Sequence, residues 1–142
     1  MKTLRRVLEA KGHDVYSTTP DTLVFDALRE MADRDVGALI VMEEGRVVGI
    51  FSERDYARKI ILVGKSSRET PVRDVMTSRV VYARPDLTLE ECLALMTDKR
   101  IRHLPVMKDD ELTGVVSIGD LVKGIIDEQR FIIGQLESYV SG

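Results

Sequence analysis

Two short stretches of the chain each place a serine and an aspartate three residues apart, directly after an apolar run. "GIFSERD" covers residues 49–55 and "GVVSIGD" covers residues 114–120. At the start of a helix, Ser-x-x-Asp forms a capping box, in which each side chain pairs with a main-chain N–H. The same groups suit a ligand, because a carboxylate accepts hydrogen bonds from sugar hydroxyls and a helix N-terminus attracts phosphate. For a single motif both interpretations stay open.

The two motifs occupy equivalent positions in an internal repeat. Shifted by 65 residues, the segment 20–61 aligns without a gap with the segment 85–126, and 13 of the 42 aligned positions are identical. Self-similarity over most of a chain indicates a duplicated structural module. Because the motif recurs at the same place in both halves, ligand binding at one or both motifs becomes the favoured interpretation.

Each half of the chain predicts the same order of elements, β-α-β-β-α. An extended stretch ends at a proline, an amphipathic helix follows, and two strands joined by a turn lead into the Ser-x-x-Asp motif. The turns are expected at "EEGR" (43–46) and "KDDE" (108–111). We predict an α+β fold of two repeats, residues 1–66 with an N-terminal helix and residues 67–142 with a C-terminal helix. Since one repeat is too small to bury a core alone, the two should pack through their sheets with pseudo-twofold symmetry.

The composition limits the classes of protein to which this chain can belong. The 142 residues carry a net charge of −3, with 44% hydrophobic and 32% charged residues, which is typical of a soluble globular protein without a nucleic-acid partner. No apolar run approaches the roughly 20 residues that span a bilayer, and the N-terminus lacks the apolar block of a secretory signal. The single cysteine, Cys92, excludes an internal disulfide. We therefore expect a cytoplasmic protein with no membrane partner.

The repeat also carries a family resemblance. With "VGALIV" at residues 36–41, "IRHLPV" at residues 101–106 and the two Ser-x-x-Asp motifs, the chain resembles a pair of CBS domains, also called a Bateman module. It is similar to stand-alone bacterial pairs and to plant mitochondrial pairs that regulate thioredoxin. The resemblance implies a non-enzymatic sensor of an adenosine-containing ligand such as AMP, ADP, ATP, NAD(H) or S-adenosylmethionine. That ligand would be regulatory, and no catalytic cofactor is implied.

The motifs supply the groups that an adenosine phosphate needs. Its ribose requires an acceptor, its phosphate requires donors and positive charge, and its base requires an apolar slot. Asp55 and Asp120 are the candidate ribose acceptors, and Ser52 and Ser117 can donate to ribose or phosphate.

The two motifs differ in their neighbouring residues. Arg54, with Arg58 one turn later, gives the first motif positive charge suited to phosphate. Gly119 in the second motif instead permits close approach of a ligand to the main chain. Val115, near the end of the preceding strand, can line the base.

The family resemblance adds residues outside the motifs. It implies that the strand starts of one half line the cleft capped by the other half. Arg102 and His103 would then face a phosphate near Asp55, and Gly37 with Ala38 would leave room for adenine. A surface arginine and an interface histidine are the structural alternatives. Further candidates, from the main chain at the adenine edge and from the first extended stretch, are Val15, Thr18 and Val80.

Catalysis and metal binding are not expected. His13, His103 and Cys92 do not make a common zinc ligand set, and no Walker-type phosphate loop occurs. Cys92 falls on the apolar side of a predicted helix, which favours a buried, inert thiol. A small hydrolase acting on a bound nucleotide is the weaker alternative.

The prediction is a regulatory module that binds an adenine nucleotide and signals to an unknown protein target by a change of conformation or assembly. We also expect a homodimer, because an apolar stripe in the tail is a candidate contact between copies; its residues are Ile125, Ile132, Leu136 and Val140. The alternative is a ligand-independent interaction module, for example one that regulates a redox partner.

Overall fold

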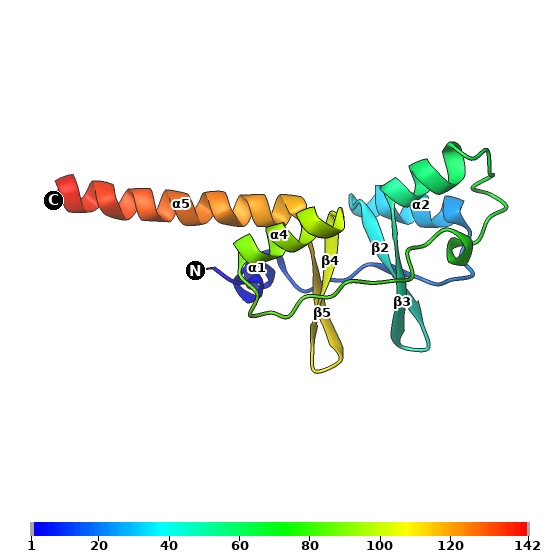
Figure 1. Ribbon diagram of the computed structural model, residues 1–142, viewed down its shortest axis with the longest axis horizontal. Helices are drawn as coiled ribbons and strands as arrows, with labels where there is room; N and C mark the ends of the chain where they lie inside the picture. The colour runs from blue at the N-terminus through cyan, green and yellow to red at the C-terminus, as the bar shows by residue number, and fades with distance from the viewer. Residues whose placement is uncertain (1, 142) are drawn as a thin grey trace. The chain divides into compact units, whose positions relative to one another are not determined.

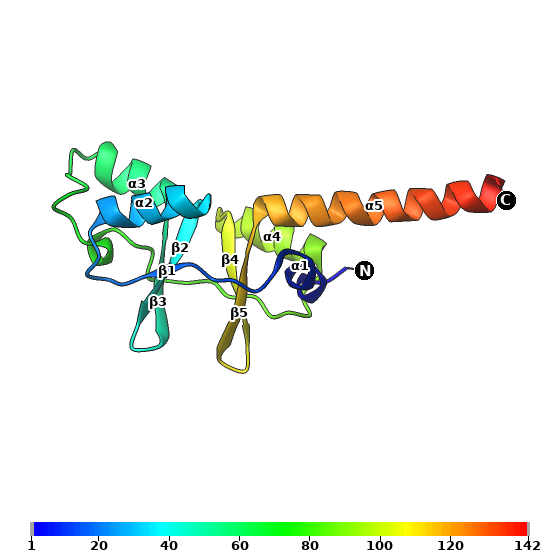
Figure 2. The same ribbon diagram turned by 180° about the vertical axis from the view of Figure 1, so that it is seen from behind.

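The computed structural model describes residues 2–141. Figure 1 and Figure 2 show its helices and strands from opposite sides. The mixture of helices with two small sheets confirms the predicted α+β class. In chain order the elements are α1 (Leu4–Lys11), β1 (Ser17–Thr18), α2 (Val24–Arg34), β2 (Ala38–Glu43), β3 (Arg46–Ser52), α3 (Glu53–Tyr56), the π-helical turn η1 (Ala57–Ile61), the 3-10 turn η2 (Val72–Asp74), α4 (Leu89–Lys99), β4 (His103–Lys108), β5 (Glu111–Ser117) and α5 (Ile118–Ser141).

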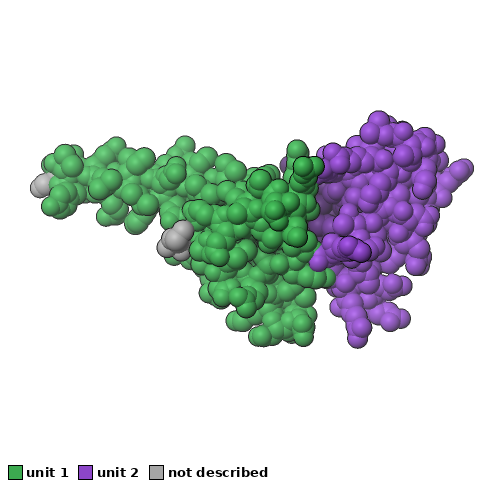
Figure 3. All heavy atoms as spheres, viewed as in Figure 1, with its two compact units in different colours: residues 1–14, 81–142 green, residues 15–80 purple. Residues whose placement is uncertain are grey.

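The chain forms two compact units, which Figure 3 colours separately. One consists of residues 15–80 and the other of residues 1–14 together with 81–142. The predicted repeats, 1–66 and 67–142, are divided differently, and their outermost residues lie outside the described part of the chain. The compact units differ because α1 packs with the second hairpin, whereas η2 packs into the core of the first. The repeat boundary itself stays a prediction.

In the unit of residues 15–80, three strands form one sheet in the order β1-β2-β3. β1 runs parallel to β2, and β2 and β3 form an antiparallel hairpin. Glu44 and Gly45 make its two-residue turn with φ of 52° and 76°, the left-handed values that a type I′ turn requires. The turn expected at "EEGR" is thus confirmed. The core of this unit consists of Val24, Ala27, Met31, Leu39, Val41, Phe51, Ile60, Val72 and Val75.

The other unit contains the equivalent hairpin, with β4 antiparallel to β5. Asp109 and Asp110 form its turn, with φ of 51° and 65°, which confirms the turn expected at "KDDE". The preceding extended stretch is not a full strand, since Ala83 makes only an isolated parallel bridge with Val106. The core of this unit includes Leu4, Val7, Leu8, Leu89, Cys92, Met96, Leu104, Val116 and Leu121.

The ends of α2 and α4 fix where the hairpins begin. Each helix is followed by a residue in the left-handed conformation, Asp35 with φ of 55° and Arg100 with φ of 57°. The next N–H groups, of Val36 and Ile101, donate to helical carbonyls five residues earlier. These bonds satisfy carbonyls at the helix ends, and they lead the chain directly into β2 and β4.

α1 docks on β5 through its apolar face, although the sequence assigned this helix to the first repeat. Leu4, Val7 and Leu8 are buried there. Gly114 in β5 gives Leu8 the space it needs, because a Cβ on this glycine would lie only 2.7 Å from Leu8 Cδ2. The packing places Lys11, at the end of α1, beside the beginning of α5.

α5 is a helix of 24 residues, much longer than one repeat requires. Its first turns pack on α1, α4 and β5, with Leu121 and Gly124 buried. Its C-terminal part extends past the other elements of its unit in both views (Figure 1, Figure 2). The tail predicted to carry an apolar stripe therefore forms a continuous helix with little of its surface covered.

Candidate functional site

The second Ser-x-x-Asp motif joins β5 to α5. Asp120 Oδ2 accepts a hydrogen bond from the Ser117 main-chain N–H at 2.8 Å. In return, the Asp120 N–H donates to Ser117 Oγ at 3.1 Å. The predicted capping box is therefore present, and it uses one of the two carboxylate oxygens.

Lys11 brings a positive charge from α1 to the same carboxylate. Its Nζ donates to Asp120 Oδ2 at 2.7 Å and to the Val115 carbonyl at 2.9 Å. Oδ1 of Asp120 accepts no hydrogen bond from any of residues 2–141, and the side chain is 24% exposed. This oxygen thus remains available to a ligand at the helix N-terminus.

The surroundings of Asp120 favour its ionised form. Burial raises the pKa of Asp120, but the hydrogen bonds from Lys11 and the Ser117 N–H, with the charge of Lys11, outweigh burial. The net effect lowers the pKa of this carboxyl below its ordinary value of 3.8. At neutral pH the site therefore presents a charged carboxylate next to an ammonium group.

This lowered pKa predicts a loss of stability in acid. A carboxyl whose pKa is lower in the folded protein adds stability above its unfolded pKa and loses it as pH falls through the folded pKa. We expect the free energy of unfolding of the Asp120→Asn variant to approach that of the unchanged protein as pH falls below about 4. Urea unfolding at pH 7 and pH 3 measures the difference, with Asp98→Asn, an exposed position on α4, as control. An equal difference at both pH values contradicts the prediction.

The first Ser-x-x-Asp motif has a different environment. Asp55 Oδ2 accepts from the Ser52 N–H at 3.0 Å and from Ser52 Oγ at 3.1 Å. Its Oδ1 accepts from Thr77 Oγ1 at 3.1 Å and lies 3.0 Å from Lys59 Nζ. Asp55 is only 7% exposed. Both oxygens are therefore committed to groups of the same unit, and a ribose would have to displace them.

Each unit brings its own strand start next to its own helix cap. Ala38 pairs with Ser52 across the first hairpin, and His103 pairs with Ser117 across the second. The preceding carbonyls, of Gly37 and Arg102, accept from the first N–H groups of α3 and α5 at 3.0 Å and 2.9 Å. The geometry therefore groups these predicted residues with the cap of their own hairpin.

The other predicted ligand-binding residues lie around these caps. Arg54 and Arg58 are exposed on α3 and η1. Gly119 is exposed at the start of α5, where a Cβ would meet only Ser117 Oγ at 3.7 Å. Thr18 pairs with Val41 in the sheet, and the half-buried Val15 and Val80 lie at the ends of the first unit. Their predicted contacts with a ligand stay predictions.

A surface hollow of about 530 Å³ lies beside the first helix cap. Gly37 is the one predicted site residue on its lining. Apolar and acidic side chains both line the hollow; its lining residues are Leu28, Met31, Ala32, Asp35, Val36, Gly37, Glu53 and Tyr56.

Nothing in the described chain supplies a reactive thiol or a metal ligand set. Cys92 is buried in α4, and burial raises its pKa to about 11, so its thiol is protonated at neutral pH. Within residues 2–141, no three histidine, cysteine or acidic side chains cluster in a way that could hold a metal ion. None of the helices in this range combines the length and apolar character needed to cross a bilayer.

Two hairpin units, each leading through a Ser-x-x-Asp cap into a helix, form a tandem module of two similar domains. The profile of the CBS domain family matches residues 7–62 and 72–127. The chain therefore belongs to the CBS domain family and contains two copies of the domain, as the sequence predicted.

Similar proteins include curated relatives and solved structures. The chain is 41% identical over 150 aligned positions to the mitochondrial CBS domain-containing protein CBSX3 of Arabidopsis thaliana, covering 99% of this chain and 72% of the relative. A structure of a protein with CBS domains from Burkholderia ambifaria is 44% identical, with a TM-score of 0.87, covering 90% of this chain and 96% of that one. The crystal structure of the CBS domain NE2398 is 45% identical, with a TM-score of 0.84, covering 88% and 98%.

Proposed function

We propose that this chain is a regulatory CBS pair that binds an adenosine-containing ligand at the cap of α5. The observation that carries the proposal is that only one oxygen of the Asp120 carboxylate is hydrogen-bonded. Oδ2 accepts from Lys11 and from the Ser117 N–H, and Oδ1 can accept from a ligand. A ribose offers two neighbouring hydroxyl donors to such an acceptor.

The same corner also suits a phosphate. Lys11 places an ammonium group 2.7 Å from the carboxylate, and the N-terminus of the long helix α5 favours an anion. We therefore place the ribose on Asp120 and the phosphate towards Lys11 and Ser117. AMP, ADP, ATP and NAD(H) are the candidate ligands.

One solved structure with the same fold supports adenosine compounds as the class of ligand. The CBS domain pair of MJ0100, 18% identical with a TM-score of 0.78, was solved in complex with 5′-methylthioadenosine and S-adenosyl-L-methionine. The fold therefore accommodates adenosine compounds in that protein, and we extend the ligand class to this chain on the chemistry of Asp120.

A signal requires that the ligand bind two states unequally. A ligand phosphate placed towards Lys11 competes with Asp120 for the ammonium group. Lys11 ties α1 to the cap through Asp120 and Val115. We propose that binding weakens this contact and so changes how α1 is held.

A homodimer and a cytoplasmic location belong to the same proposal. Assembly has a precedent in the hexameric CBS-CP12 protein of bloom-forming cyanobacteria, 24% identical to this chain.

The proposal predicts ligand-dependent stability that disappears with Asp120. In thermal unfolding, a ligand at about 100 times its Kd should add about 2.7 kcal/mol to the free energy of unfolding. AMP, ATP, NADH and S-adenosylmethionine are each tested against the unchanged protein, Asp120→Asn and the control Asp98→Asn. We expect one ligand to stabilise the unchanged protein and the control but not Asp120→Asn. If no ligand stabilises any variant, the proposal is wrong.

A ligand-independent interaction module is the second candidate function. It is favoured by Asp55, whose two oxygens are fully used within its own unit. Three consecutive exposed apolar residues, Ile61, Leu62 and Val63, lie at the end of η1 and directly after it, and they offer a surface for a protein partner. Regulation of a redox partner would be one such role.

A further inference from the structure

An apolar stripe runs along the outer part of α5. Its members are spaced alternately four and three residues apart, which is the heptad spacing of helices that pair along a seam. We call this stripe the α5 seam; its positions are Val122, Ile126, Gln129, Ile133, Leu136 and Val140. All of its apolar members are exposed, from 42% for Ile126 to 84% for Val140.

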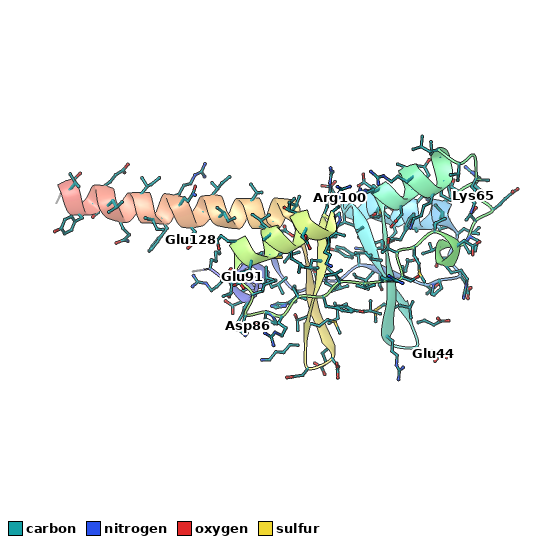
Figure 4. All side chains as sticks on the ribbon, in the orientation of Figure 1. Glu44, Lys65, Asp86, Glu91, Arg100 and Glu128 are labelled. Carbon is teal, nitrogen blue, oxygen red and sulfur yellow. The ribbon has the colours of Figure 1, made fainter. Side chains whose placement is uncertain are left out.

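Nothing in the described chain covers the seam. Every residue from 129 to 141 is exposed, and α5 packs only its first turns on its own unit. Figure 4 shows side chains pointing into solvent all along the helix beyond Glu128. The uncovered stretch, residues 129–141, is about as short as the isolated helices of ~12–15 residues that are marginal in water, so another surface packed on the seam would stabilise it.

We propose that the α5 seam pairs with the same seam of a second copy, with the two helices antiparallel. The residue types suit self-pairing, because Ile126, Ile133 and Val140 occupy one core position of the heptad and Val122 with Leu136 occupy the other. In the antiparallel register, Val122 faces Val140 of the second copy. Ile126 then faces Leu136, and Gln129 faces Ile133.

Charge at the flanks of the seam selects this orientation. Lys123, Arg130 and Glu137 share one flanking position of the heptad, and Ile125, Ile132 and Tyr139 share the other. In an antiparallel pair a flank meets the same flank of the partner helix, so Lys123 meets Glu137 of the second copy at both ends. In a parallel pair each charge would face an apolar residue. Arg130 falls near the twofold axis, where Asp127, three residues earlier on its own helix, can offset its charge.

The charge of α5 argues against a membrane as the occupant. Residues 118–141 contain four acidic and two basic residues. Helices that lie on anionic lipid are rich in lysine and arginine on the polar face. An excess of acidic residues would repel such a surface, whereas a second copy offers opposite charges at both ends of the seam.

The first test compares two exposed apolar residues on opposite sides of α5. Ile133, in the seam, is 53% exposed, and Phe131, on the opposite side, is 66% exposed. Sedimentation equilibrium of the full chain should give a dimer whose dissociation constant rises at least about tenfold in Ile133→Asp, because a charge becomes buried in an apolar seam. Phe131→Asp should leave the constant unchanged, and circular dichroism should show folded protein in both variants. A dimer unaffected by Ile133→Asp, or a monomeric unchanged chain, overturns the proposal.

The second test concerns orientation. Ile126→Cys and Leu136→Cys lie about 15 Å apart on one helix, at ~1.5 Å per residue, which is too far for a disulfide within the chain. Under oxidation, the double variant should form a covalent dimer and neither single variant should; Cys92 is buried and stays unreactive. Covalent dimers of a single variant would show parallel helices and overturn the antiparallel proposal. In the same way, Lys123→Glu should weaken the dimer, and adding Glu137→Lys should restore it.

The inference names the surface of the proposed homodimer and rests on that part of the proposed function. It does not rest on ligand binding, since Ile133, the seam position that is tested, lies almost four helical turns beyond Asp120 on α5. If Ile133→Asp is monomeric but still stabilised by the ligand, both proposals stand. If Ile133→Asp stays dimeric, the seam fails while ligand binding is untouched.

Discussion

Replacing Asp55 with alanine is expected to lower the free energy of unfolding by about 3 kcal/mol. The carboxylate is 7% exposed, accepts hydrogen bonds from Ser52 and Thr77, and forms an ion pair with Lys59. Its removal takes the carboxylate partner from the Ser52 N–H and the Thr77 hydroxyl, which belong to half-buried residues. A buried group left without a partner costs about 1–3 kcal/mol. Lys59 loses less, because its partly exposed ammonium also donates to the Val75 carbonyl.

The repeat provides a matched control for this variant. Asp120 holds the equivalent position, but its Oδ1 has no partner among residues 2–141 and its side chain is 24% exposed. Asp120→Ala should therefore cost about 1 kcal/mol, the ordinary cost of losing a partly exposed hydrogen bond. Urea unfolding of the two variants at pH 7 measures the difference. Equal costs would show that Asp55 is no more tightly held than Asp120, and the assignment of separate roles would fail.

The different surroundings of Asp55 and Asp120 distinguish a structural cap from a proposed ligand acceptor, which the Ser-x-x-Asp motif alone does not distinguish. Asp55 is held as a structural cap of α3, and its bond with Thr77 ties the segment that follows η2 to this helix. Asp120 leaves Oδ1 without a hydrogen bond within residues 2–141 and has its ammonium partner, Lys11, on another helix. The duplication therefore preserves the Ser-x-x-Asp cap while the groups around it differ.

The local features of the fold could be predicted from the sequence. Both capping boxes, at Ser52 and Ser117, depend on residues three positions apart. The hairpin turns at Glu44–Gly45 and Asp109–Asp110 follow from residues that tolerate positive φ. Such features depend on neighbours in the chain, and the repeat doubled the evidence for each.

The partners of the two aspartates could not be predicted, because they come from distant segments. Lys11 is 109 residues from Asp120, and Thr77 is 22 residues from Asp55. Only Lys59, four residues after Asp55, could have been found from helical spacing. The same limit explains why α1 was assigned to the first repeat, since no local pattern tells which hairpin a helix packs on.

Replacing Leu8 with alanine is expected to lower the free energy of unfolding by about 3 kcal/mol. Leu8 is 1% exposed in the core that joins α1 to the second hairpin, so the shortened side chain leaves a cavity. Because Lys11 lies one turn later on α1, weaker docking should also loosen its contact with Asp120. Urea unfolding measures the stability, and thermal unfolding with ligand shows whether the site is altered.

The packing of Leu8 against Gly114 allows a double-variant test of the contact between α1 and β5. A Cβ on Gly114 would lie 2.7 Å from Leu8 Cδ2 and 3.1 Å from Cδ1, so Gly114→Ala should overpack the contact at a cost of about 1–3 kcal/mol. In the Leu8→Ala background those two methyl groups are gone, and the added methyl group can occupy part of the cavity. The double variant should therefore be more stable than the sum of the single effects allows, by about 1 kcal/mol or more. Strictly additive effects would mean that Leu8 and Gly114 do not pack against each other, and that α1 is held on β5 by other contacts.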